Sequence, residues 1–174
     1  HSRMLVPSTN LSESLEIAKA TAEKFVAGEP DAEGTTIGPV SNKVQFDKIR
    51  GLIQAGIDEG AELVCGGPDM PEGVDKGYYI RPTVFGNVTN DMRIAREEIF
   101  GPVLSILPYE TEEDAVEIAN DTIYGLAAYI QSGDSEHAYE IAAKLRVGNV
   151  SVNGASSDIA APFGGYKQSG NGRE

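Results

Sequence analysis

The sequence predicts an α/β fold, a three-layer α/β/α domain built on a mainly parallel sheet. The main observation is that short segments rich in apolar and β-branched residues alternate along the chain with longer segments of helical periodicity. Connections as long as these helices favour parallel crossovers, which place helices on both faces of a sheet. A chain of 174 residues is also long enough to bury a core.

The first strand is predicted over residues 3–6, directly before Pro7. Apolar residues then recur at steps of three and four, the helical period, up to Gly28, where we expect the helix to end. The members of this apolar stripe are Leu11, Leu15, Ala18, Ala22 and Phe25. Residues 29–38, rich in proline, glycine and acidic residues, are predicted to form a surface loop.

A second helix is predicted to begin at Ser41, whose hydroxyl can cap it, and to end at Gly60. Its apolar face consists of Phe46, Ile49, Ile53 and Ile57. Residues 61–65 then form a short buried strand. Residues 68–77 are predicted to be an irregular excursion.

Two further strands are predicted in the middle of the chain. Residues 78–88 have the β-branched and aromatic content of a strand, although Pro82 favours an edge position or a bulge. Residues 103–107 are continuously apolar, as in a buried strand.

The last third of the chain repeats the alternation. Thr111, followed by three acidic residues, is predicted to start a helix that ends near Asn120. A strand over residues 125–132 and a helix that ends at Gly148 follow. Residues 149–153 are predicted to be the last strand of the core.

Charge and composition exclude several kinds of partner. The chain has 14 Lys and Arg against 27 Asp and Glu, a net charge of −13, which disfavours nucleic acid and anionic membranes. No apolar run approaches the ~20 residues that span a bilayer, and no signal peptide is recognised, so we expect a cytoplasmic protein. Cys65 is the single cysteine and the histidines are His1 and His137, so neither a disulfide nor a metal site is predicted.

The acidic segment 96–103 precedes the strand at residues 103–107. Glutamate and proline are poor strand formers, so the sheet does not explain this composition. A carboxylate such as that of Glu98 can accept two hydroxyl hydrogen bonds from a sugar diol, and the Phe100 ring can supply a flat apolar wall. The alternative is a solvated acidic turn with Phe100 inserted into the core.

Two stretches together carry a resemblance to a known family. Residues 96–103 read Arg-Glu-Glu-Ile-Phe-Gly-Pro-Val, and residues 162–170 read Pro-Phe-Gly-Gly-Tyr-Lys-Gln-Ser-Gly. Residues 2–6 and 45–48 fit the same family. The four stretches follow one another along the whole chain in the family's order, and together they resemble the aldehyde dehydrogenase superfamily. The resemblance implies the fold of its catalytic domain, with residues 1–174 forming the substrate-side part.

The resemblance also implies the chemistry. In this family a cysteine thiolate attacks an aldehyde, a hydride passes to NAD or NADP, and water releases the carboxylic acid. By this resemblance the nucleophilic Cys, the general-base Glu and the nucleotide-binding domain lie upstream of this chain, and the oligomerisation strand follows it. We therefore expect no catalytic residue here, an inactive isolated chain, and a full-length homodimer or homotetramer acting on a small aldehyde.

Several residues match positions with a function in the family. Glu98 matches the carboxylate that holds the ribose on the nicotinamide side of the cofactor, and Phe100 the aromatic beside it. Gln45 and Lys48 match positions near the same ribose, although a solvated helix face explains them equally well. Phe163, Ser156 and Ser157 match the substrate pocket, with an ordinary core position as the alternative for Phe163.

Two questions about function remain open at this point. Cys65 has no neighbouring His or Lys in sequence to lower the pKa of its thiol, so we expect a packing role for it. The chain as a whole is expected to belong to an NAD(P)-dependent aldehyde dehydrogenase. The alternative is a non-enzymatic α/β protein-interaction module derived from the same family.

Overall fold

The computed structural model describes residues 2–156 and 160–174, and it divides the chain into two units, His1–Glu110 and Thr111–Glu174, each with its own sheet. Within the described ranges, no helix combines the length and the apolar character needed to cross a bilayer.

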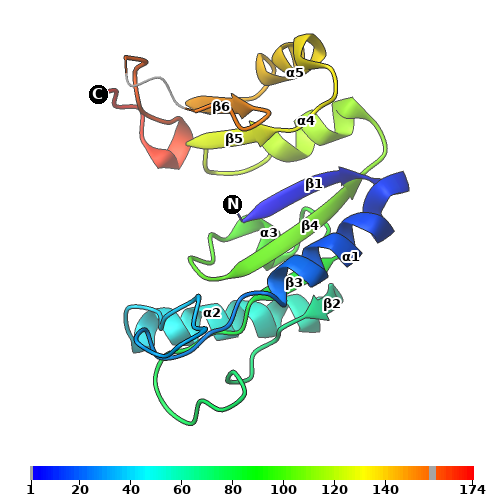
Figure 1. Ribbon diagram of the computed structural model, residues 1–174. Coiled ribbons are helices and arrows are strands. Elements are labelled where there is room, and N and C mark those ends of the chain that lie inside the picture. Colours follow the sequence, from blue (N-terminus) through cyan, green and yellow to red (C-terminus); the bar gives the residue numbers. More distant parts are fainter. Residues whose placement is uncertain (1, 157–159) are drawn as a thin grey trace. The chain divides into compact units, whose positions relative to one another are not determined.

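The first unit is built on a four-stranded sheet, labelled in Figure 1, with the order β1-β4-β3-β2. Strands β1 and β3 both run parallel to β4, and β2 runs antiparallel to β3 at the edge. The predicted mainly parallel sheet is therefore confirmed. The strands are β1 (Arg3–Pro7), β2 (Glu62–Cys65), β3 (Thr83–Gly86) and β4 (Val103–Tyr109).

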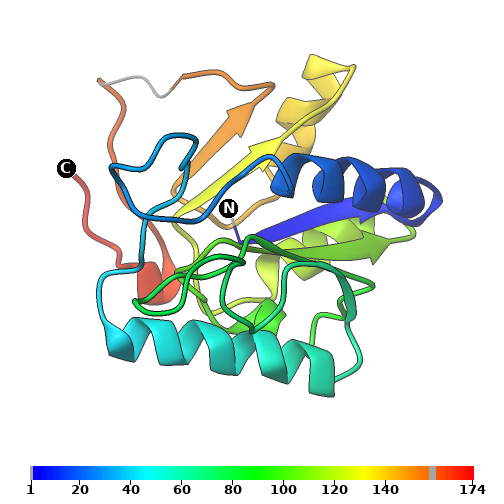
Figure 2. The same ribbon diagram turned by 60° about the horizontal axis from the view of Figure 1, so that its bottom comes forward.

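Helices cover both faces of this sheet (Figures 1 and 2). Successive side chains of its central strands point to opposite faces, and most of them are apolar and buried, so both faces need a cover. From β4, Ile106 packs with Leu15 of α1 in one buried cluster. On the other face, the Ser105 hydroxyl donates to the carbonyl of Ile94 in α3. The helices are α1 (Leu11–Ala22), preceded by the 3-10 turn η1 (Ser8–Asn10), α2 (Lys43–Asp58) and α3 (Arg93–Arg96).

The first helix ends earlier than its apolar stripe predicted. It stops at Ala22, and Phe25 lies outside it with 48% of its surface exposed. The reason is tertiary: the backbone of Val26 bonds with Thr36, and Ala27 forms a parallel bridge with Ile37. Pairing with the loop at residues 29–38 therefore ends the helical stripe.

Four other details of this unit also differ from the predictions. Asn42, not Ser41, caps α2, since its side chain accepts a hydrogen bond from the backbone N–H of Gln45 at 2.9 Å. Strand β2 is only partly buried, because it lies at the sheet edge. Strand β3 begins directly after Pro82 and lies inside the sheet, while the bulge falls on β2. The short helix α3 was not predicted.

The second unit contains a separate two-stranded parallel sheet of β5 (Ala127–Ile130) and β6 (Asn149–Val152). Residues 149–153 were predicted to close the main core, and that prediction is wrong because β6 pairs only with β5 in the described part of the chain. Its other elements are α4 (Glu112–Asn120), α5 (Ser135–Ala142) and the 3-10 turn η2 (Lys167–Ser169). Helix α5 ends well before Gly148.

The predicted start of α4 is confirmed. The Thr111 hydroxyl accepts from the backbone N–H of Asp114, whose carboxylate accepts from the backbone N–H of Thr111, which is a capping box. The two reciprocal bonds satisfy backbone donors that the first turn of a helix leaves open.

The glycine-rich segment near residue 165 is bonded to residues 123–125, which precede β5. Tyr166 donates its backbone N–H to the carbonyl of Gly125 at 2.9 Å, and Gly125 donates its own N–H to the Ser169 hydroxyl at 3.0 Å. Gln168 donates to the carbonyl of Ile123 at 2.9 Å. These bonds give the segment a structural role in the second unit.

A histidine in the second unit gives a prediction about pH. The hydrogen bond and the negative charge of Glu112, 2.6 Å from the His137 Nε2, raise the pKa of His137 above its ordinary value. Because the folded-state pKa is raised, the pair stabilises the fold fully below the unfolded pKa of about 6.5, and this contribution is lost as pH rises through the folded pKa. We expect Glu112→Gln to lower the pKa of His137, as followed by NMR titration of its ring. An unchanged titration in this variant would contradict the prediction.

Candidate functional site

Four residues that the sequence analysis associated with a cofactor come together in the first unit. Gln45 and Lys48 lie in the first turns of α2, and Glu98 and Phe100 lie in the loop between α3 and β4. Gln45 and Lys48 are three positions apart and therefore project from the same side of the helix.

The two α2 side chains bind the backbone of that loop. The Gln45 Nε2 donates to the carbonyls of Ile99 and Phe100 at 2.9 and 2.8 Å. The Lys48 Nζ donates to the carbonyl of Glu98 at 2.6 Å and lies 5.5 Å from the centre of the Phe100 ring. The alternative of a merely solvated helix face for Gln45 and Lys48 is therefore wrong.

Neighbouring apolar residues of the loop point in different directions. Ile99 is 1% exposed and fills the core, whereas Phe100 is 66% exposed. The alternative in which Phe100 inserts into the core is therefore wrong. Phe100 has a φ of 56°, in the left-handed region that residues with a Cβ adopt at a cost.

A glycine allows the loop to lie close to α2. A Cβ on Gly101 would stand 2.7 Å from the Cδ1 of Ile49, which is fully buried. The Ile-Phe-Gly order of this loop thus has a local physical reason. Ile99 fills the core, Phe100 is exposed, and Gly101 allows the close approach to α2.

The two adjacent carboxylates of the loop have different environments. Glu97 forms an ion pair with the Arg93 Nε at 2.8 Å, and its hydrogen bond raises the pKa of Arg93 above the ordinary value. Glu98 is half-buried, and within the described residues its carboxylate has no hydrogen-bond or ion-pair partner. Glu98 is therefore the carboxylate of the pair that is available to a ligand.

Together these groups fit a sugar diol beside a planar ring. The Glu98 carboxylate can accept two hydroxyl hydrogen bonds, and the exposed Phe100 ring offers an apolar face. The loop is held in place by α2 before any ligand arrives. Its side chains can bind and orient a ligand, but none of them is a nucleophile for an aldehyde.

The residues predicted for the substrate pocket lie in the second unit. Phe163 is 59% exposed, so its alternative as an ordinary core residue is wrong. Its backbone exchanges two hydrogen bonds with Glu174, at 3.1 and 2.9 Å. Ser156 is exposed, and Ser157 lies outside the described residues. The structure thus brings the four residues of the cofactor set together within the first unit.

The environment of Cys65 is unlike that of a nucleophilic cysteine. Its side chain is half-buried in β2 beside the apolar cluster under α1. Burial raises the pKa of the Cys65 thiol, which lowers the fraction of reactive thiolate. A packing role accounts for this residue.

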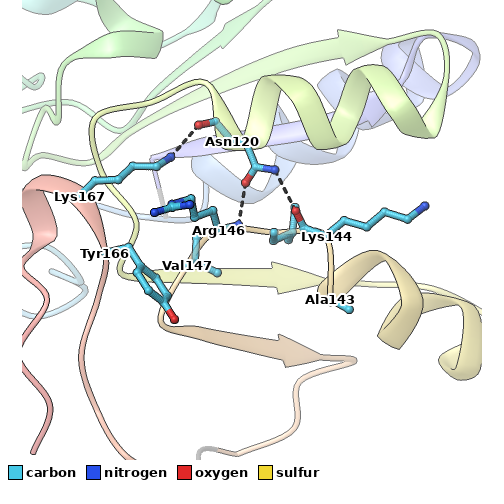
Figure 3. Close-up of a pocket in the computed structure, with 8 residues that line it drawn as sticks. Asn120, Ala143, Lys144, Arg146, Val147, Tyr166 and Lys167 are labelled. Atoms are coloured by element: carbon cyan, nitrogen blue, oxygen red, sulfur yellow. Dashed lines mark hydrogen bonds between the residues drawn. The ribbon is translucent and has the colours of Figure 1, made fainter.

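The sequence analysis missed a hydrogen-bond centre in the second unit, shown in Figure 3. The Lys167 Nζ donates to the backbone carbonyl of Asn120 at 2.7 Å, and the Asn120 side chain bonds to the backbone of Lys144 and Arg146. These residues border a hollow of about 560 Å³. Lys167 stands in the second motif, but its partner is 47 positions away, so no local signal joins the two.

Comparison with known proteins places this geometry in a family. The model of the aldehyde dehydrogenase family matches residues 1–174. The 3-succinoylsemialdehyde-pyridine dehydrogenase of a Pseudomonas species is 50% identical over 173 residues, which is 99% of this chain and 36% of that protein.

Solved structures agree. Aldehyde dehydrogenase C from Pseudomonas syringae, a mutant complexed with NAD+ and octanal, superposes with a TM-score of 0.95 at 52% identity, covering 99% of this chain and 36% of that one. The Mycobacterium tuberculosis aldehyde dehydrogenase complexed with NAD+ has a TM-score of 0.94 and 44% identity, with the same coverage. This chain spans about 36% of the length of these relatives. It belongs to the aldehyde dehydrogenase family.

Proposed function

We propose that the chain is the substrate-side part of a longer NAD(P)-dependent aldehyde dehydrogenase that oxidises an aldehyde to a carboxylic acid. The family match over residues 1–174, and the coverage of 36% of the relatives' length, support this proposal. Relatives whose structures contain NAD+ support the cofactor. The match to the aldehyde dehydrogenase family favours this function over a protein-interaction module.

The observation that carries the proposal is the Glu98 carboxylate, which has no partner in the described part of the chain, close to the exposed Phe100 ring. In the proposed complex, Glu98 accepts hydrogen bonds from the two hydroxyls of the nicotinamide-side ribose, and Phe100 packs beside it. When bound, the cofactor would supply the acceptor for the hydride that leaves the aldehyde carbon. Glu98 and Phe100 orient that acceptor and exclude water from one of its faces.

The remaining functions are assigned to other residues. We propose that the nucleophilic cysteine, the general-base glutamate and the nucleotide-binding domain come from sequence outside these 174 residues. Cys65 packs half-buried against the apolar cluster of the first unit, and burial raises the pKa of its thiol. Phe163, Ser156 and Ser157 are proposed to contribute to the wall of the aldehyde pocket. The complete protein is proposed to be a cytoplasmic homodimer or homotetramer.

Glu98→Gln in the full-length protein tests the cofactor role. A neutral amide retains the shape but loses the charge-assisted hydrogen bonds, so we expect the Kd for NAD to rise about tenfold. Isothermal titration measures this directly. Glu97→Gln is the matched control, because Glu97 is already paired with Arg93, and it should leave the Kd nearly unchanged.

Two further assays complete this test. Cys65→Ala in the full-length protein should retain aldehyde-dependent NADH formation, and the 174-residue chain alone should form none. Equal NAD affinity in the wild type and Glu98→Gln would contradict the cofactor role. Loss of activity in Cys65→Ala, with folding intact, would contradict the assignment of the nucleophile.

A further inference from the structure

Two side chains of α2 hold three consecutive carbonyl groups of the loop before β4. The Gln45 Nε2 donates to the carbonyls of Ile99 and Phe100 at 2.9 and 2.8 Å, and the Lys48 Nζ donates to that of Glu98 at 2.6 Å. We refer to these three hydrogen bonds as the carbonyl clamp. It joins residues that are 50 to 55 positions apart in sequence.

The donor capacity of Gln45 is fully used by this clamp. A glutamine amide has two N–H groups, and the two loop carbonyls accept both of them. Only the Gln45 amide oxygen is left for a ligand. Lys48 keeps further donors, but its ammonium also lies over the Phe100 ring, at 5.5 Å from the ring centre. Both side chains thus act chiefly on the loop.

The loop conformation needs such support. Phe100 is in the left-handed region with a φ of 56°, which a residue with a Cβ adopts only where its surroundings impose it. The same turn places Ile99 in the core and leaves Phe100 largely exposed. A loop free to relax to an ordinary φ would move the Phe100 ring and the neighbouring carboxylate of Glu98 together.

We propose that Gln45 and Lys48 are positioning residues, which act on the cofactor through the backbone of residues 98–100. The clamp fixes the one loop conformation in which the Glu98 carboxylate stays unpaired and the Phe100 ring stays displayed. This inference rests on the proposed function and deepens it, because it assigns the orientation of the ribose-binding groups to α2. The loop is set before the cofactor binds, so the binding free energy is not spent on ordering it.

The test measures the loop without cofactor and the cofactor affinity separately, in the full-length protein. Gln45→Met has a similar length and removes both donors. Hydrogen–deuterium exchange of the cofactor-free variant should rise in the peptide covering residues 97–103, by about tenfold for the loss of hydrogen bonds of ordinary strength. The Kd for NAD should rise about tenfold as well.

The same helix provides a matched control. Gln54 also lies in α2, and its Nε2 donates to the Asp58 carboxylate one turn away, not to the loop. Gln54→Met should change neither the exchange of residues 97–103 nor the Kd. At position 48, Lys48→Met should raise both the exchange and the Kd, whereas Lys48→Arg, which keeps a donor, should leave both close to the wild type. This difference separates positioning from packing.

Two results would overturn the inference. A higher Kd in Gln45→Met with unchanged exchange would mean that Gln45 contacts the cofactor directly. Unchanged exchange and unchanged Kd would mean that the clamp does not fix the loop conformation. Exchange is measured without cofactor, so increased exchange in Gln45→Met would support the clamp whatever happens to NAD binding. Unchanged NAD binding in Glu98→Gln would overturn only the proposed function.

Discussion

Gly148→Ala is expected to destabilise the second unit by at least about 3 kcal/mol. A Cβ at this position would overlap the backbone carbonyl oxygen of Gly164 and approach Gly165. A backbone carbonyl cannot rotate away as a flexible side chain can. Either the start of β6 or the glycine-rich segment must move, and Gly148 would then lose its hydrogen bonds to Gly125 and Leu126, now 3.1 and 3.0 Å long.

Chemical denaturation of matched variants measures this loss. Gly133→Ala is the control, since no atom of the described residues lies within 4 Å of its added Cβ, and we expect its stability to stay within about 0.5 kcal/mol of the wild type. Equal stability of the two variants would show that the Gly148 to Gly164 contact yields easily. The glycine-rich motif would then owe its composition to something other than this close approach.

Gly56→Ala is expected to cost about 2 kcal/mol, although alanine favours helices. In α2 the added methyl group would lie 2.9 Å from the Ile94 Cδ1 and 3.1 Å from the Phe85 Cζ, and both side chains are buried. The packing of α2 against α3 and β3 leaves no room for it.

Gly51→Ala in the same helix is expected to have the opposite effect. Among the residues that the structure describes, its Cβ would meet nothing within 4 Å. Only the backbone preference then remains, and stability should rise by about 0.5 to 1 kcal/mol. Denaturant midpoints of the two variants provide the comparison. Destabilisation by both substitutions would mean that helix propensity is not the deciding term at Gly51.

Local patterns were sufficient for several of the regular elements. The apolar period of α2, the continuous apolar run of β4 and the Thr111 capping signal each act within one element, so sequence spacing predicts them directly. The end of α1 could not be predicted in this way, because it depends on the pairing of Ala27 with Ile37 ten residues later. The separate sheet of β5 and β6 likewise depends on which strands meet.

At the candidate site, too, some features could be predicted from the sequence and others depended on the tertiary structure. The motif at residues 96–103 indicated Glu98 and Phe100 from the sequence, and the resemblance added Gln45 and Lys48. It did not decide whether Ile99 or Phe100 enters the core, since both are apolar and adjacent. The φ of 56° at Phe100 decides it, and no local sequence signal predicts a backbone angle of this kind at a phenylalanine.

The sequence by itself thus determined the family resemblance and the mainly parallel α/β architecture, and it proposed the residues of the candidate site. Only the tertiary structure decided that Arg93 neutralises Glu97, that Glu98 has no partner for its carboxylate among the described residues, and that Gln45 and Lys48 bond to the loop. The physical reason is the reach of the interactions. Helical and strand periods act over a few residues, whereas the carbonyl clamp joins groups 50 to 55 positions apart, whose meeting depends on how α2 packs beside the sheet.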